Sequence, residues 1–313
     1  MTMDLETYRA LGLHETRSRD VNGHQSSDFA NYLQHAGDGP YHPCPEAFPG
    51  DEVPTGAISR HADWDQSRIY PGTSRVISVY TPAGLDRSKP ANLIVFNDGA
   101  SYLDPKGAVR AAQVLDSLHA KSEIAPTVAV FVNPGHAPTD PATPRREVYA
   151  AAMEQRRQEY DALTDTFGRF LTEEVLPFVE AREGLILTRD PEHRTVCGIS
   201  SGGICAFTAA WHFPDQFRRV LSHCGSFVNI MGGHNYPYLV GITPRLPLRV
   251  FLQSGENDGR NALGDWPLAN QTMARALAFA GYDVRFDYGT GAHNLRHAGA
   301  IFAGCLTLLS RRR

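Results

Sequence analysis

The chain has 313 residues, of which 42% are hydrophobic and 20% are charged, proportions that are ordinary for a globular protein with a sizeable core. Its formal net charge of −4 argues against a general nucleic-acid binder or a protein of anionic membrane surfaces. The sequence has no apolar run long enough to span a membrane, and its first residues lack the basic and apolar regions of a signal peptide. We therefore predict a cytoplasmic protein with no membrane or nucleic-acid partner.

The cysteines give no sign of a metal centre or of a disulfide framework. There are five of them, none in a C-x-x-C pair or at metal-ligand spacing, and four lie in apolar runs where a thiol packs as a small hydrophobic group. An odd number of cysteines in such places suits a reducing compartment. The sequence predicts no metal and no cofactor.

Two regions are expected along the chain. Residues 1–70 are polar, rich in Gly, Pro, His and Asp, and show little periodicity, so we predict an irregular N-terminal extension packed on the main domain. Residues 71–313 carry the regular pattern of a single folded domain.

Within that domain, apolar segments that read as strands alternate with segments of helical periodicity. Strands are predicted at 76–80, 92–97, 127–132, 195–197, 219–224, 248–253 and 283–288. Helices are predicted at 109–118, 163–175 (ending near Pro177), 204–211, 267–281 and 298–309. This alternation predicts an α/β fold whose mostly parallel central sheet is covered by helices on both faces.

One stretch carries a chemical signature. Gly198-Ile-Ser-Ser-Gly202 matches G-x-S-x-G between a short apolar strand and an apolar helix, which is the setting of a nucleophile elbow. Glycines at both ends would let the backbone turn sharply and expose the hydroxyl of Ser200 at a helix N-terminus. Ser201 is in the wrong register, because Ile199 stands where the pattern needs glycine. The alternative reading is a Gly-Ser loop of another α/β protein.

A serine nucleophile needs a base and an acid that follow it in the order Ser, Asp/Glu, His. His293 follows the last predicted strand, and His297 is the alternative one helical turn later. Asp258 follows the preceding strand. We prefer it to Asp265 because it lies closer to the strand end, and to Glu256 because the turn at Gly255 leaves more room for a side chain a little further on. The alternative roles of Asp258 are a turn residue or a helix cap.

The negatively charged intermediate of acyl transfer also needs hydrogen-bond donors. We expect one from the backbone N–H of Ser201, directly after the nucleophile. The second is expected from the loop Asn97-Asp98-Gly99-Ala100, where Gly99 lets the backbone turn inward and Ala100 offers its N–H.

Several ordered motifs together resemble the enterochelin-esterase-like serine esterases, in the superfamily of esterase D, feruloyl esterases and mycolyltransferases. The resemblance covers about residues 69–309 and rests on the segments 96–102, 157–161, 198–203, 225–227, 255–258, 264–270 and 289–293. It implies an α/β-hydrolase fold, carboxylic-ester substrates, a metal-independent Ser-His-Asp mechanism, and an oxyanion donor after the Asp-Gly turn.

We therefore expect an ester hydrolase that acts through an acyl-enzyme on a small to medium ester, such as a siderophore-like, sugar or aromatic acyl ester. An acyltransferase on the same triad and a catalytically silent binding protein are the alternatives, and a homo-oligomer is left open. The substrate cleft is expected to be lined by Asp98, Arg157, Glu159, Tyr160 and Trp266, together with His234. Each has a structural alternative, such as a helix-face ion pair, a neighbour of a helix cap or a buried aromatic ring.

Overall fold

The computed structural model describes residues 36–137 and 145–311, and all statements below concern these two stretches. They contain an eight-stranded sheet in the order β1-β2-β4-β3-β5-β6-β7-β10. The strands are β1 (Ala57–Trp64), β2 (Arg75–Thr81), β3 (Asn92–Asn97), β4 (Thr127–Val132), β5 (Arg194–Ile199), β6 (Arg219–His223), β7 (Arg249–Asn257) and β10 (Asp283–Ala292). A short hairpin joins β8 (Arg260–Asn261) and β9 (Gly264–Asp265).

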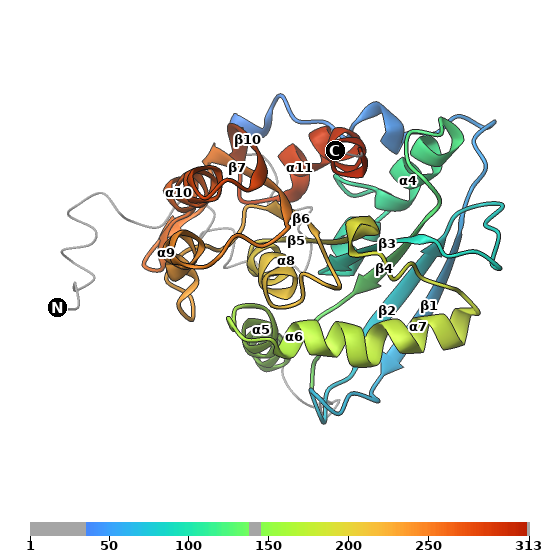
Figure 1. Ribbon diagram of the computed structural model, residues 1–313, viewed down its shortest axis with the longest axis horizontal. Coiled ribbons are helices and arrows are strands. Elements are labelled where there is room, and N and C mark those ends of the chain that lie inside the picture. Colours follow the sequence, from blue (N-terminus) through green and yellow to red (C-terminus); the bar gives the residue numbers. More distant parts are fainter. Residues whose placement is uncertain (1–35, 138–144, 312–313) are drawn as a thin grey trace.

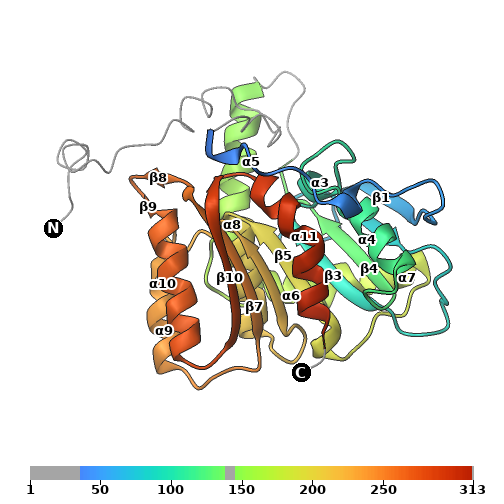
Figure 2. The ribbon, with the colours of Figure 1, turned by 90° about the horizontal axis from the view of Figure 1, so that it is seen from above.

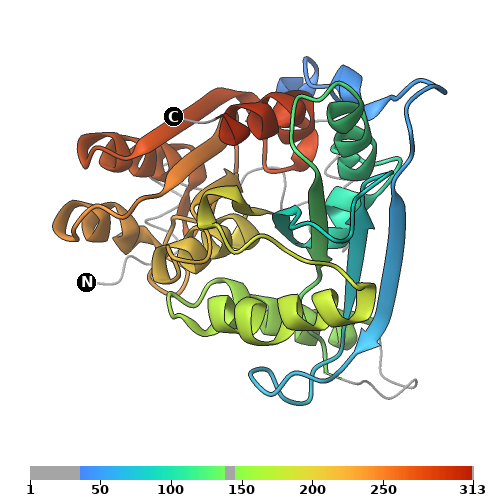
Figure 3. The same ribbon diagram turned by 45° about the vertical axis from the view of Figure 1, so that its right-hand side comes forward.

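The sheet is parallel from β4 to β10, whereas β2 runs antiparallel to both β1 and β4. Every residue of β4, β5 and β6 is buried, which explains their continuous apolar character, because strands covered on both faces show no alternation. Figure 3 shows β1 and β2 at one edge of this sheet.

Helices cover both faces, so the core consists of two hydrophobic clusters. Helices α4 and α11 lie on one face, above the sheet in Figure 1, and pack on side chains such as Phe96 and Phe131. Helices α6 to α10 cover the other face. In Figure 2, which looks from above, α4 and α11 lie in front of the sheet. The helices are α3 (Gly99–Leu103), α4 (Ala111–Ala120), α5 (Arg145–Tyr160), α6 (Thr166–Arg169), α7 (Leu176–Glu183), α8 (Ser201–His212), α9 (Tyr236–Ile242), α10 (Trp266–Phe279) and α11 (Leu295–Ser310). The predicted α/β-hydrolase fold is confirmed.

Part of the predicted irregular extension is regular. Ala57–Trp64 forms β1, which pairs with β2 at the edge of the sheet. Most of its side chains are exposed or half-buried, so this strand lacks the apolar pattern on which the sequence prediction depended. Residues 1–35 of the predicted extension lie outside the described residues.

The predicted end of a helix near Pro177 is wrong. A π-helical segment, Phe170–Val175, leads directly into α7, and Pro177 lies in the first turn of that helix. Because the chain is continuously helical from Thr166, this proline lies within a helix and contributes no N–H to its hydrogen bonds. The helix ends instead at Gly184, whose φ of 60° is left-handed. Helix α5 was not predicted at all.

Over residues 36–137 and 145–311, no helix is both long and apolar enough to cross a bilayer. All five cysteines are buried and unpaired with one another.

Candidate active site

The elbow between β5 and α8 has the sharp geometry that the motif predicts. Ser200 lies between the two elements with φ 59° and ψ −123°, a conformation that side chains rarely adopt. A Cβ on Gly198 would lie 2.2 Å from the carbonyl oxygen of Gly202, so a side chain at position 198 would collide with the start of the helix. Asn97 secures this helix start, because its Nδ2 donates to the carbonyl oxygen of Gly202 at 2.9 Å.

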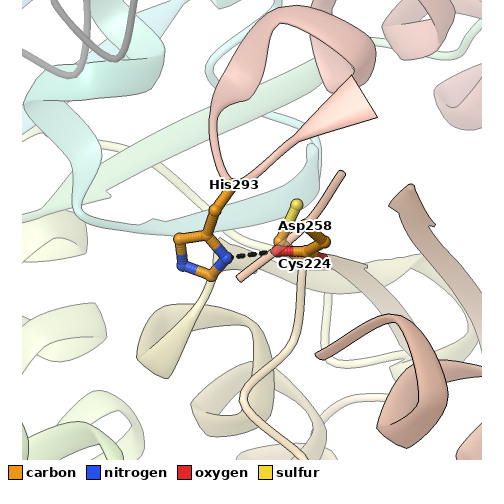
Figure 4. Close-up of side chains that lie close together, drawn as sticks. All are labelled: Cys224, Asp258 and His293. Atoms are coloured by element: carbon orange, nitrogen blue, oxygen red, sulfur yellow. Dashed lines mark hydrogen bonds and ion pairs between the residues drawn. The ribbon is translucent and has the colours of Figure 1, made fainter. Parts of the chain in front are cut away.

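The strands bring the other two candidates to the same edge of the sheet. Asp258 directly follows β7 and His293 directly follows β10, and these parallel neighbours pair Asn257 with Ala292 near their ends. Nε2 of His293 lies 2.9 Å from Oγ of Ser200, and Nδ1 lies 2.5 Å from Oδ1 of Asp258 (the latter contact is drawn in Figure 4). The three predicted residues therefore form one hydrogen-bonded chain.

Asp258 is fully buried and its oxygens have further donors. The hydroxyl of Ser254 donates to Oδ2 at 2.6 Å, and the backbone N–H of Gly259 donates to Oδ1 at 2.7 Å. These bonds fix the direction of the carboxyl group toward the imidazole.

The alternative acid and base have other partners. Asp265 caps α10, where it accepts the N–H of Leu268 at 2.9 Å, and it also pairs with Arg260. His297 is buried, receives a hydrogen bond from Gln253 and contacts Asp287 at 2.7 Å through Nε2. Neither residue is bonded to His293 or Ser200.

Cys224 lies next to this chain. Its Sγ and ligand atoms of Asp258 and His293 lie within 4.8 Å of one another, a spacing open to a metal ion (Figure 4). Burial raises the pKa of the Cys224 thiol well above its usual range, and the nearby Asp258 raises it further. A metal ligand must be the thiolate, and the raised pKa of Cys224 disfavours that form, so this group of residues fits a metal ion poorly.

The two predicted oxyanion donors differ in availability. Ser201 is the first residue of α8, so its N–H precedes the first intrahelical hydrogen bond and points out of the helix end. The N–H of Ala100 instead donates to Oδ1 of Asn133 at 2.9 Å. Ala100 would have to exchange this partner for a substrate oxygen, and its role stays a prediction.

Three of the expected cleft residues have structural partners. Glu159 is fully buried and forms a two-pronged ion pair with Arg75, at 2.7 and 3.0 Å. Arg157 is exposed and pairs with Glu154 one turn earlier on α5. Tyr160 is fully buried, and its hydroxyl accepts the N–H of Asp98. Glu159 and Tyr160 are buried against these partners, and their contact with substrate stays a prediction.

Asp98 supports the loop before α3 from inside. Its backbone is left-handed, with φ 55°, and its carboxylate accepts two hydrogen bonds from Arg156, at 2.8 and 2.7 Å. Both side chains are almost fully buried. Asp98 therefore shapes the loop that carries Ala100. His234, another of the expected cleft residues, is exposed on the short turn Gly233–Asn235.

Trp266 lies against the chain of candidate residues. Its ring meets that of His293 edge to face, with centroids 5.5 Å apart, and its Nε1 donates to Oγ of Ser226 at 3.2 Å. Sequence reasoning gave Ser226 no role, although it lies within the motif Gly225-Ser-Phe227 that contributed to the family resemblance.

Residues from the N-terminal part hold the loop that carries His293. The buried carboxylate of Asp38 accepts the backbone N–H of Ala292 at 2.9 Å and the side-chain amide of Asn294 at 2.7 Å. Tyr41 stacks on His297, with ring centroids 4.1 Å apart. These contacts join residues 38 and 41 to the loop of His293, and the packing of the whole extension stays a prediction.

Known proteins resemble this chain in sequence and in fold. The iron(III) enterobactin esterase of Dickeya dadantii (strain 3937) is 25% identical over 264 residues, which are 79% of this chain and 54% of that protein. The chain thus spans about half the length of this curated relative.

Two solved structures illustrate the likeness in fold. The enterobactin esterase from Shigella flexneri, solved in the presence of enterobactin, superposes with a TM-score of 0.62 at 21% identity over 83% of this chain and 61% of that one. A ferulic acid esterase from Anaeromyces mucronatus gives a TM-score of 0.57 at 17% identity, with 85% and 95% of the two chains covered.

The model of an esterase family, described as "Putative esterase", matches residues 69–295, which include all three members of the hydrogen-bonded chain. This match confirms the resemblance drawn from the sequence motifs, and the chain belongs to this esterase family.

Proposed function

We propose that this protein is a serine carboxylic-ester hydrolase with Ser200 as nucleophile, His293 as general base and Asp258 as the acid that orients the imidazole. The observation that carries the proposal is the continuous hydrogen-bonded chain from Ser200 Oγ through His293 to the buried Asp258, at 2.9 and 2.5 Å. Membership of the esterase family supports the same reaction class.

In the first half of the reaction, Nε2 of His293 takes the proton of Ser200 as Oγ attacks the ester carbonyl carbon. The N–H of Ser201 stabilises the negative charge that develops on the carbonyl oxygen. His293 then gives the proton to the departing alcohol, and the acyl group remains on Ser200.

In the second half, His293 takes a proton from water, and the hydroxide attacks the acyl-enzyme. The tetrahedral intermediate collapses, the proton returns to Ser200 and the carboxylic acid leaves. Asp258 holds the proton on Nδ1 throughout, so that Nε2 faces the nucleophile as an acceptor.

The proposed substrates are small to medium esters, and catecholate and feruloyl esters come first. The enterobactin esterase relative and the ferulic acid esterase neighbour motivate these two classes. Acetylated sugars and nitrophenyl esters complete a panel in which kcat/KM ranks the acyl and alcohol groups.

A fluorophosphonate probe tests the mechanism directly, because it reacts with activated serine hydroxyls. We expect the parent protein to be labelled at Ser200 and to release free carboxylic acid from at least one ester of the panel. Absence of labelling and of turnover in a folded preparation would contradict the proposal. Transfer of the acyl group to an added alcohol in preference to water would replace hydrolysis by acyl transfer on the same residues.

A further inference from the structure

Ser226 contacts the proposed nucleophile at two points. Its Oγ lies 3.3 Å from Oγ of Ser200, and its backbone N–H donates to the carbonyl oxygen of Ser200 at 3.1 Å. The residue is completely buried and follows the end of β6 by a short turn. A second hydroxyl therefore lies against the oxygen that is expected to react.

The donors available around Ser226 fix the direction of these hydrogen bonds. A serine hydroxyl carries one proton, and an indole Nε1 can only donate. Under the proposed function, Ser200 gives its proton to His293, so its Oγ is an acceptor toward Ser226. Ser226 Oγ accepts from Trp266 Nε1 at 3.2 Å and keeps its own proton for Ser200.

We propose that Ser226 is a further catalytic residue, whose hydroxyl donates a hydrogen bond to the reacting oxygen of Ser200, and that Trp266 is a positioning residue that orients this hydroxyl. The inference rests on the proposed function, because it concerns the charge on the nucleophile. It assigns to Trp266 a role in positioning instead of the substrate contact expected from the sequence.

The hydrogen bond from Ser226 stabilises negative charge on Ser200 Oγ each time that oxygen is deprotonated. This happens when His293 removes its proton in the attack on the ester, and again when the oxygen is expelled from the second tetrahedral intermediate. Ser226 keeps its own proton in both steps, so the proton balance of the triad is unchanged. A hydrogen bond to a charged atom in a buried place is worth about ten- to a hundredfold in rate.

The loop of Ser226 is held in place from several sides. Nδ2 of Asn270 on α10 donates to the carbonyl oxygen of Gly225 at 2.9 Å. A Cβ on Gly225 would lie 2.5 Å from Oγ of Ser222, so the turn is packed too closely for a larger residue. The Ser226 hydroxyl is therefore fixed before substrate arrives, as electrostatic stabilisation of a transition state requires.

The test compares Ser226→Ala with Ser222→Ala. Ser222 is a matched control: it is equally buried on the same segment, and its Oγ has no hydrogen-bond partner among the described residues. With a fluorophosphonate and the best ester substrate, we expect Ser226→Ala to lower the maximal labelling rate and kcat about ten- to a hundredfold. The probe affinity, KM and melting temperature should stay close to the parent, and Ser222→Ala should react at the parental rate.

A double-mutant cycle tests the role of Trp266. Trp266→Phe removes the indole N–H but keeps an aromatic ring beside His293. It should therefore slow labelling severalfold in the parent and have little further effect in Ser226→Ala, because the N–H acts through that hydroxyl. Equal effects in both backgrounds would show that Trp266 acts independently and would overturn its assigned role.

Labelling of a folded Ser226→Ala variant at the parental rate would overturn the inference while the proposed function stands. If that variant does not fold, Ser226→Cys keeps nearly the same size with a weaker donor, and it should be labelled about tenfold more slowly. A parental rate for Ser226→Cys would then overturn the inference. Failure of the parent protein itself to react would instead refute the proposed function.

Discussion

At the scale of single residues, the direction of each proposed catalytic group is set by neighbours outside the triad. Ser254 and Gly259 hold the carboxylate of Asp258, and Trp266 packs against the ring of His293. Substitutions at Ser200 and Asp258 should therefore change chemistry more than packing, because the remaining contacts stay in place.

Ser200→Ala should abolish turnover while the protein still folds. The hydroxyl lies at the elbow and only part of the residue is buried, so its removal leaves no large core cavity. Loss of the nucleophile of a triad costs on the order of a millionfold in kcat. Turnover of a good substrate within about tenfold of the parent, in a protein with an unchanged circular dichroism spectrum, would exclude Ser200 as the nucleophile.

Asp258→Asn and Asp265→Asn should affect different properties. An amide at 258 can donate to the imidazole and favour the wrong tautomer, which in a related triad costs about 10⁴-fold in kcat. An amide at 265 weakens a helix cap and the contact with Arg260, and should cost about 1 kcal/mol or less of stability. Measuring kcat and melting temperature for both variants separates the roles. A large activity loss at 265 with a mild one at 258 would move the triad acid to Asp265.

At the scale of elements, the sharp turn between β5 and α8 depends on close backbone contact. Gly198 and Gly202 face each other there, and the strained backbone of Ser200 persists because β5 and α8 are both buried around it. The same type of substitution should therefore have opposite effects at the elbow and on an open helix face.

Gly198→Ala should lower the free energy of unfolding by about 2 kcal/mol or more, because the new methyl group would lie 2.2 Å from the carbonyl oxygen of Gly202. The control is Gly304→Ala on α11, where a Cβ meets nothing within 4 Å; this change should stabilise by about 0.5–1 kcal/mol. Chemical denaturation of both variants measures the difference. Equal stability of the two would contradict the packing argument.

At the scale of the whole molecule, the N-terminal segment connects to the catalytic loop across 254 residues of sequence, through the bond from the Ala292 N–H to Asp38. Asp38→Ala should reduce kcat about tenfold and lower the free energy of unfolding by about 2 kcal/mol, because two donors beside His293 lose their buried acceptor. Asp51→Ala, in an exposed turn of the same segment, is the control and should leave both quantities unchanged. An Asp38→Ala variant with parental activity and stability would show that the loop of His293 keeps its conformation without the hydrogen bonds to Asp38.

A buried carboxyl behind the elbow should make stability depend on pH. Burial raises the pKa of Asp161 from 3.8 to about 6, and the Ser201 hydroxyl and Arg156 offset only part of this rise. One carboxyl oxygen has no partner among the described residues. Because the folded pKa lies above the unfolded one, the stabilising contribution of this group is complete below about pH 4 and is lost as the pH rises through 6.

Asp161→Asn should therefore be about as stable as the parent near pH 4, and more stable by about 2–3 kcal/mol near pH 8. The measurement is denaturant unfolding of both proteins at several pH values, taken as a difference so that other titrating groups cancel. A stability difference that does not change with pH would refute the assignment of this titration to Asp161.

The sequence alone determined the elements whose pattern is local. β3 and β4 match the predicted ranges 92–97 and 127–132, because a strand buried on both faces has a continuous apolar run in its interior. The nucleophile elbow follows from the spacing of two glycines around Ser200, and the cap of α10 from Asp265 before Pro267. The edge strand β1 and the charged helix α5 escaped prediction because neither has a clear apolar periodicity.

Only the tertiary structure decided which polar side chains meet. The sequence left Asp258, Glu256 and Asp265 as alternatives, and the pairing of β7 with β10 placed Asp258 against His293. It also suggested substrate contacts for Glu159, which the fold instead buries against Arg75, 84 residues away. Ser226 and Asp38 could not be found in advance, since their partners are distant in sequence. Strand register and packing determine such contacts, and no local pattern of residues encodes them.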